Sequence, residues 1–311
     1  MPFLPVGGQA VIEGVMMRSP SRMAVAVRRP EGDIAMMERP FISLTRRYKA
    51  LALPVVRGAV SLFETMFLGI TALNYSADEA VKEAGAPAAA ASKFQGVAQG
   101  LTIVLAFALG ILLFVVLPAR LAGWLGASGR VAFGLVDGAF RLLAFMLYLL
   151  LISRWREMAR VLGYHGAEHK AIHALENRAP LTPESVQTFS RFHPRCGTSF
   201  LFLVVVVSIV VFSFIGRPHG IGDHLLRIAC LPLIAGVAFE FIRWSGRQVQ
   251  RPLVRALVWP GLQFQRLTTR EPDLTMCAVA IAALERVRLD ETLVALESRA
   301  IPAEAEVAFI Q

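Results

Sequence analysis

Two histidines one helical turn apart are the residues whose types and spacing could most readily do chemistry. His165 and His169 lie in the run Tyr164-His-Gly-Ala-Glu-His-Lys170. Positions i and i+4 share a helix face, so two imidazoles placed there can bind one metal ion. Glu168 stands about 60° round the helix from this pair, at 100° per residue. The order His-x-x-Glu-His is that of inverted zinc peptidases, whose glutamate can deprotonate a metal-bound water. The alternative is a polar helix with solvated histidines.

Three more side chains could complete a metal site. His193 and Cys196 stand in the run Arg191-Phe-His-Pro-Arg-Cys-Gly-Thr-Ser199, and His-x-x-Cys is a usual spacing of metal ligands. Glu240 lies near the end of an apolar segment, where ionisable residues are rare and indicate function. The alternatives are an ion pair of Glu240 with a nearby arginine, and a buried Cys196 that acts only as a small apolar residue. A third is a Cys196 nucleophile activated by a histidine.

A site of this composition predicts a divalent metal. Zn is the expected ion for a histidine-rich set, and a carboxylate as third ligand would also admit Mn or Fe. Three protein ligands plus water would indicate an enzyme, whereas four would indicate a structural metal site. Glu168 is the predicted general base. The predicted metal ligands are His165 and His169, with Glu240, His193 or Cys196 completing the set.

Long apolar runs must position these residues, and they indicate a polytopic membrane protein. The chain has 311 residues, of which 55% are hydrophobic and 18% charged. Soluble domains have roughly 45–50% and about 25%. A membrane span needs about 20 mostly apolar residues to cross about 30 Å of hydrocarbon. Four segments fit, namely 97–119, 131–153, 199–216 and 225–243.

Lysine and arginine are concentrated on one side of the predicted bundle. Eleven precede the first span, 7 lie in 154–198 and 9 lie from Arg243 onward, whereas 120–130 and 217–224 hold 2 and 1. The positive-inside rule therefore predicts a multi-pass protein of the bacterial cytoplasmic membrane with both termini and the central loop in the cytoplasm. Topology accounts for the net charge of +9. The basic residues are dispersed without stacking aromatics, so no nucleic-acid partner is predicted.

The first 50 residues predict a small cytoplasmic β-meander. Short apolar runs at 9–13, 23–27 and 34–37 alternate with turn signals. Glu13 lies at the end of the first run. On a strand it would share a face with Val11, and it could be a further ligand or base if that face meets the site. The alternative is a solvent-facing strand residue.

Two further segments predict helices at the membrane surface. The stretch 53–75 carries Arg57 and Glu64, which are costly inside lipid, and so predicts an interfacial or partly re-entrant helix followed by a connector. The C-terminal region 244–311 is predicted to be cytoplasmic, with an amphipathic helix over 273–299.

The remaining polar residues of the predicted bundle have structural explanations. Asp137 and Arg141 are spaced i, i+4 in the second span and are expected to neutralise each other there. His219 and His224 flank a predicted external turn, on the opposite side from the histidine cluster.

Four segments together resemble the YqhQ-like bacterial membrane proteins, and the resemblance covers nearly the whole chain. They are Gly7-Gly-Gln-Ala-Val-Ile-Glu-Gly-Val-Met-Met-Arg18, Tyr164-His-Gly-Ala-Glu-His-Lys170, His193-Pro-Arg-Cys-Gly-Thr-Ser199 and Gln265-Arg-Leu-Thr-Thr-Arg-Glu-Pro272. The resemblance implies a bacterial cytoplasmic-membrane protein and a metal-dependent enzyme, and it assigns no catalytic residue. After this last segment the family tends to have a Gln and a Glu. Here Met276-Cys-Ala-Val279 is apolar, which speaks against a polar role for that helix.

The sequence therefore predicts a mainly α, polytopic membrane protein, with a four-helix transmembrane bundle, a small N-terminal cytoplasmic β-meander and cytoplasmic helices. The predicted function is a metal-dependent hydrolase acting at the cytoplasmic membrane interface, in contact with membrane lipids, on a substrate with a membrane-embedded part or on a membrane protein partner. The alternative is a non-catalytic membrane scaffold or assembly factor with a structural metal site. A transporter or channel component is a third reading, and few polar residues in the spans speak against it.

Overall fold

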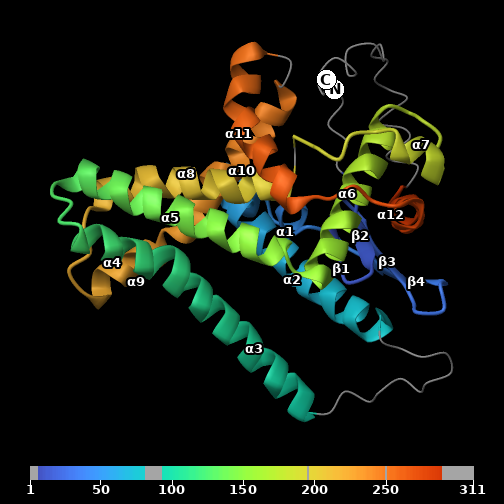
Figure 1. Ribbon diagram of the computed structural model, residues 1–311, viewed down its shortest axis with the longest axis horizontal. Helices are drawn as coiled ribbons and strands as arrows, with labels where there is room; N and C mark the ends of the chain where they lie inside the picture. Colours follow the sequence, from blue (N-terminus) through green and yellow to red (C-terminus); the bar gives the residue numbers. More distant parts are fainter. Residues whose placement is uncertain (1–5, 81–92, 195, 249–250, 289–311) are drawn as a thin grey trace.

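The chain folds into a bundle of apolar helices with a small, helix-covered sheet at one end (Figure 1). A computed structural model describes residues 6–80, 93–194, 196–248 and 251–288. Four of the described helices are long and apolar enough to cross a membrane. The prediction of a mainly α, polytopic membrane protein with an N-terminal β-meander is confirmed.

The sheet has four antiparallel strands in chain order. They are β1 (Gly7–Val11), β2 (Gly14–Arg18), β3 (Arg22–Arg28) and β4 (Ile34–Pro40). The sequence patterns predict three runs and miss β2, because the turn between β1 and β2 is formed by Ile12 and Glu13 (φ 51°) and no glycine or proline lies within it. Almost all of β2 and β3 is buried on both faces. One face packs on α2 (Val56–Ala80), and the other packs on the helices Arg156–Glu176 and Leu274–Val287.

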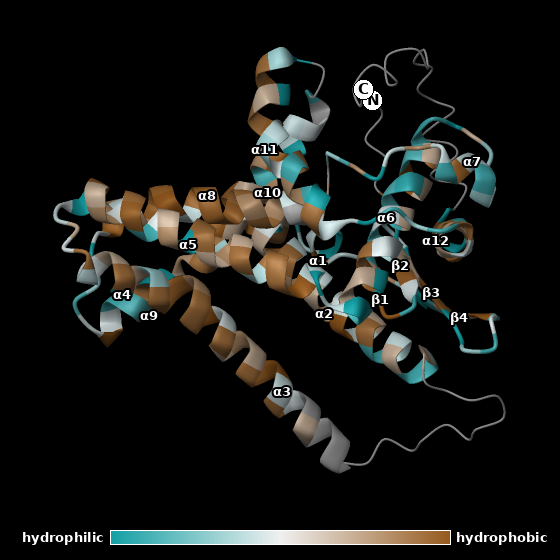
Figure 2. Ribbon diagram, viewed as in Figure 1, coloured by the Kyte–Doolittle hydropathy of each residue, from teal (hydrophilic) through white to brown (hydrophobic). Residues whose placement is uncertain are grey.

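The bundle consists of apolar helices that follow the predicted spans, and Figure 2 shows their hydrophobic residues in brown along the ribbon. They are α3 (Lys93–Ile111), α4 (Leu117–Trp124), α5 (Arg130–Ser153), α8 (Gly197–Ile215), α9 (Ile221–Ala229) and α10 (Leu231–Arg247). A π-helical turn, Leu112–Val116, joins α3 to α4. The fourth predicted span breaks between α9 and α10 at Cys230, two residues before Pro232, which cannot donate a backbone hydrogen bond.

The candidate spans include α2, which the sequence placed at the membrane surface. Val56–Ala80 has 25 residues, and Ser199–Ile215 of the third predicted span is among the shorter apolar helices. The charges of α2 have partners that local sequence does not reveal. Arg57 forms an ion pair with Glu240 on α10. Glu64 accepts hydrogen bonds from the Ser43 hydroxyl and from a backbone amide.

The second half of α2 is nevertheless tied to the sheet. Leu68 and Ala72 are buried in the cluster beneath β3, and Glu79 accepts a 2.6 Å hydrogen bond from Arg29. Only residues 56–67 lie clear of this cluster, and twelve residues of helix extend about 18 Å. The hydrocarbon layer is about 30 Å thick. The interfacial placement of α2 therefore stays a prediction, with this helix long enough to cross a membrane and its second half packed on the sheet.

A buried charge cluster holds together the end of the bundle that lies away from the sheet. Asp137 on α5 accepts hydrogen bonds from Arg141 (3.1 Å) and from Arg227 on α9 (3.1 Å). The expected pairing of Asp137 with Arg141 is confirmed, and Arg227 is an addition. Both guanidinium groups also contact the Phe212 ring, with Arg141 4.7 Å and Arg227 4.9 Å from its centroid. The α8–α9 connection, where His219 stands, lies at this same end (Figure 1).

Two of the remaining described helices, Arg156–Glu176 and Leu274–Val287, pack on the sheet. These remaining helices are α1 (Leu44–Arg47), the 3₁₀ helix Lys49–Ala52, α6 (Arg156–Glu176), α7 (Pro183–Gln187), α11 (Pro252–Thr268) and α12 (Leu274–Val287). The predicted helix over 273–299 corresponds to α12, and residues 289–299 lie outside the described part of the chain. Met276 and Cys277 are buried against the sheet and α6, which agrees with their apolar character.

Candidate metal centre

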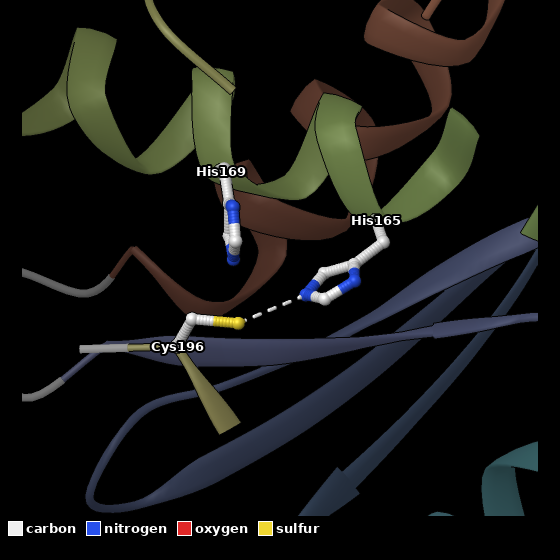
Figure 3. A group of neighbouring side chains, drawn as sticks. All are labelled: His165, His169 and Cys196. Carbon is white, nitrogen blue, oxygen red and sulfur yellow. Dashed lines mark hydrogen bonds between the residues drawn. The ribbon is translucent and has the colours of Figure 1, made fainter. Parts of the chain in front are cut away.

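Three potential ligand atoms meet where α6 faces the loop before α8. One atom each from His165, His169 and Cys196 lies within 4.8 Å of the other two. The Cys196 sulfur is 3.2 Å from Nε2 of His165, and the two imidazole centroids are 4.5 Å apart. Figure 3 shows both rings projecting from successive turns of α6 toward the sulfur. The predicted i, i+4 helical pair and its meeting with Cys196 therefore occur in the fold.

Backbone carbonyls fix the orientation of both rings. Nδ1 of His165 lies 2.7 Å from the carbonyl oxygen of Thr268, and Nδ1 of His169 lies 2.6 Å from that of Arg191. A carbonyl oxygen only accepts, so each Nδ1 carries a proton and donates it. In the neutral tautomer, Nε2 then presents its lone pair toward the cluster. Metal-binding histidines have this arrangement, in which the outer ring nitrogen donates to a carbonyl or carboxylate.

The three groups also shift one another's protonation. Burial disfavours the charged imidazole of His165, but Cys196, Glu168 and the Thr268 carbonyl outweigh burial and raise its pKa to about 9. Burial likewise disfavours a Cys196 thiolate, yet the charges of His169 and His165 and their hydrogen bonds bring the pKa of this thiol well below its usual value. The site therefore favours a thiolate, the form of cysteine that binds metals and acts as a nucleophile.

Glu168 lies beside this cluster. A carboxylate oxygen is 4.0 Å from Nε2 of His165, and the side chain is buried. Burial raises the pKa of Glu168, while the charges of His169 and His165 and a backbone hydrogen bond from Gly8 oppose that rise. A Cβ atom on Gly8 would lie 2.9 Å from Cγ of Glu168 and 2.7 Å from the Met16 carbonyl oxygen. Glycine at this position therefore lets β1 approach the carboxylate.

His193 joins a neighbouring group rather than the Cys196 cluster. Its ring centroid is 5.6 Å from that of His169, and its Nε2 is 3.5 Å from a carboxylate oxygen of Glu176. One ligand atom each from His193, Glu176 and His173 lies within 4.8 Å of the other two. Burial and the charge of His169 lower the pKa of His193 to about 3, so its ring is neutral.

The structure does not bring Glu240 to the histidines. This residue lies on α10, forms an ion pair with Arg57 and accepts a 3.3 Å hydrogen bond from the backbone amide of Val55. The expectation that Glu240 completes the ligand set is wrong, because the Arg57 guanidinium, from a helix distant in sequence, binds both carboxylate oxygens. The alternative prediction, an ion pair between Glu240 and an arginine, is correct, although the partner is Arg57 rather than an arginine close in sequence.

Glu13 is likewise held away from the cluster by charge pairing. It stands in the β1–β2 turn with a positive φ of 51°. Arg160 donates two 2.5 Å hydrogen bonds to its carboxylate, and the Tyr164 hydroxyl donates a third at 3.3 Å. Burial, followed by the charge of Glu13, raises the pKa of Tyr164 to about 12. Glu13 thus links the sheet to α6.

Gln265 on α11 positions the loop that carries His193 and Cys196. Its side-chain oxygen accepts from the backbone amide of His193 (2.8 Å), and its nitrogen donates to the His193 carbonyl (2.7 Å) and to the Ser199 hydroxyl (3.1 Å). The residue is fully buried. A search for ligands and acid–base groups passes over a neutral amide, although Gln265 opens the fourth segment of the family resemblance.

Replacement of Gln265 by leucine is expected to loosen this loop. The buried amide and carbonyl of His193 would lose their partners, and each unsatisfied group costs about 1–3 kcal/mol. Thermal unfolding of the detergent-solubilised protein should show a lower midpoint than for wild type. Gln263→Leu, on the same helix and half-buried, is the matched control and should stay near wild type. Equal losses in both variants would contradict a specific role for Gln265.

Comparison with known proteins places the chain in a family. The family described as "Protein of unknown function (DUF1385)" matches residues 53–290. The "Uncharacterized protein YqhQ" of Bacillus subtilis (strain 168) is 30% identical over 300 residues, which cover 91% of this chain and 92% of that protein. No solved structure matches the chain significantly. The chain therefore belongs to the DUF1385 family, and it is YqhQ-like over nearly its whole length.

Proposed function

We propose that this protein is a metal-dependent integral membrane enzyme, a hydrolase whose metal is held by His165, His169 and Cys196. The observation that carries the proposal is the convergence of three ligand atoms within 4.8 Å, with both rings oriented by backbone carbonyls. Three protein ligands leave a further coordination position for water or substrate, as in catalytic zinc sites.

The donor atoms narrow the choice of metal. Two imidazole nitrogens and one thiolate suit zinc, whereas manganese prefers oxygen ligands. Because Glu240 is committed to Arg57, the carboxylate that would have favoured Mn or Fe is absent from this set. When bound, the zinc ion would act as a Lewis acid that makes a bound water acidic near neutral pH.

Glu168 is the proposed general base. It lies next to both histidines on α6, is buried, and has a carboxylate oxygen 4.0 Å from Nε2 of His165. A carboxylate so close to the ligand atoms could hold the proton lost by the nucleophilic water and return it to the leaving group. The Glu168 side chain is only 6% exposed, which limits its contact with bulk water.

The position of the cluster suggests where the substrate lies. The helix α6 follows α5 after two residues, and Cys196 immediately precedes α8, so the site lies at one end of two apolar helices. The distribution of lysine and arginine supports the proposal that this end lies at the cytoplasmic face of a bacterial membrane. We propose a substrate with a membrane-embedded part, such as a lipid, a prenyl group or a membrane protein segment.

A structural metal site in a membrane scaffold or assembly factor is the second candidate, and the burial of His169 and Cys196 favours it. Such a site would need a fourth protein ligand to close it. His193 is the nearest histidine available, yet its Nε2 lies 3.5 Å from Glu176. The three-ligand arrangement therefore favours the enzyme.

Metal content is the first test of the proposal. Wild type, purified in detergent without chelators, is expected to hold zinc, and His165→Ala combined with His169→Ala should hold about one equivalent less by inductively coupled plasma mass spectrometry. Glu168→Gln should keep the metal, because a general base is not a ligand, and should be inactive in a subsequent substrate screen. A wild-type protein without stoichiometric metal, even after supplementation with Zn, Mn and Fe, would sink the proposal.

A further inference from the structure

The face of α6 that carries His165 and His169 extends beyond them toward the C-terminal end of the helix. His173 follows at the next i+4 position and Glu176 at i+3 from there, so all four side chains lie along one face of the helix. The loop before α8 runs along this face. It places Cys196 against the first pair and His193 against the second.

His173, Glu176 and His193 form a compact and enclosed group. Their ligand atoms lie within 4.8 Å of one another, and the centroids of the two rings are 4.7 Å apart. The side chain of His193 is 5% exposed and that of Glu176 is 7% exposed. Two imidazoles and one carboxylate form a donor set that binds zinc in proteins.

The surroundings orient these side chains as they do in the first cluster. Nε2 of His173 lies 2.9 Å from the carbonyl oxygen of Phe192 and donates to it, which leaves Nδ1 as the nitrogen with a lone pair. The backbone of His193 is held on both sides by the buried amide of Gln265. Three histidines of α6 thus donate to three backbone carbonyls, two of which belong to the loop that carries His193.

We propose that His173, Glu176 and His193 bind a second divalent cation of the zinc class. A metal there would cross-link α6 to the loop before α8, and so hold Cys196 in place for the first centre. The second site needs none of the ligands of the first. It therefore stands or fails separately from the proposed function.

Counting metal in matched variants tests the second site. Wild type is expected to hold about two zinc ions per chain, and about one should remain in His173→Ala/Glu176→Gln and in His165→Ala/His169→Ala. Glu157→Gln, an exposed glutamate in the first turn of the same helix, should retain both. If wild type holds about one ion and only His165→Ala/His169→Ala loses it, the proposal of a second site is overturned. If wild type holds about one ion and only His173→Ala/Glu176→Gln loses it, the second site is upheld and the proposed function is overturned.

Cobalt substitution separates loss of a ligand from loss of the fold. Protein loaded with Co²⁺ should show a sulfur-to-cobalt charge-transfer band from Cys196 and ligand-field bands from both sites. Glu176→Gln should keep the sulfur band, which shows an intact first cluster, while it loses about half of the bound cobalt. Cys196→Ser should lose the sulfur band and keep the cobalt of the second site. A Glu176→Gln protein that keeps the full wild-type cobalt content and affinity would overturn the proposal.

Discussion

Replacement of Gly166 by alanine is expected to destabilise the protein by on the order of 3 kcal/mol and to abolish metal binding at the first centre. A Cβ atom at this position would lie 2.1 Å from the carbonyl oxygen of Arg270, and a backbone group cannot rotate away. The segment that follows α11 crosses α6 at this glycine. There the Arg270 amide donates a 2.8 Å hydrogen bond to the Leu162 carbonyl. Displacement of this segment would also move Thr268, the last residue of α11, whose carbonyl orients His165.

A second glycine on the same helix provides the control. A Cβ atom on Gly163 would lie 2.9 Å from the sulfur of Met276, which belongs to a flexible side chain that can move aside. Alanine also favours the helix by about 0.8–1 kcal/mol over glycine. Gly163→Ala should therefore stay within about 1 kcal/mol of wild type. Thermal unfolding and zinc content in detergent measure both effects. A Gly166→Ala protein as stable and as zinc-rich as Gly163→Ala would refute the close approach.

Replacement of Asp137 by leucine should have an effect of similar or greater size. The variant would leave Arg141 and Arg227 buried in an apolar bundle without their shared carboxylate, and the loss of one partner from a buried ion pair costs about 3–5 kcal/mol. Contacts with Phe212 and the Gly216 carbonyl would remain, yet neither carries the negative charge. The expected result is a large fall in the thermal midpoint.

Removal of all three charges distinguishes charge imbalance from lost packing. Asp137→Leu combined with Arg141→Leu and Arg227→Met should recover much of the stability, because apolar side chains of similar volume often replace a buried ion cluster without loss. Asp78→Asn, an exposed residue near the end of α2, is the control for a lost acidic group and should change the midpoint little. A triple variant that is less stable than Asp137→Leu would contradict the expectation.

Sequence patterns predict most of the bundle and much of the site because both depend on local periodicity. Apolar runs of about 20 residues indicate spans whatever surrounds them. The i, i+4 spacing of His165 and His169 defines a shared helix face, and Cys196 follows in a stretch that must return to the same membrane surface before α8. These elements of the site were therefore open to prediction.

The parts that sequence could not reveal depend on partners that are distant in the chain. The position of Glu240 in an apolar segment suggests a ligand, but Arg57, 183 positions away in the sequence, pairs with its carboxylate. Arg227 enters the Asp137 cluster from 90 positions away. His193 was expected beside Cys196, and only the path of its loop along α6 shows that it faces Glu176. No local rule of spacing encodes such meetings.

The packing of the sheet bears on how this protein is synthesised. The strands β2 and β3 are among the first parts of the chain to be made, but one face of their sheet is covered by α12, which begins roughly 250 residues later. At about 5–20 residues per second, the ribosome needs about 12–50 s to complete that interval. Throughout this time the apolar side chains of the nascent sheet lack their final cover at the membrane surface. The N-terminal sheet therefore completes its packing only after the last described helix has been synthesised.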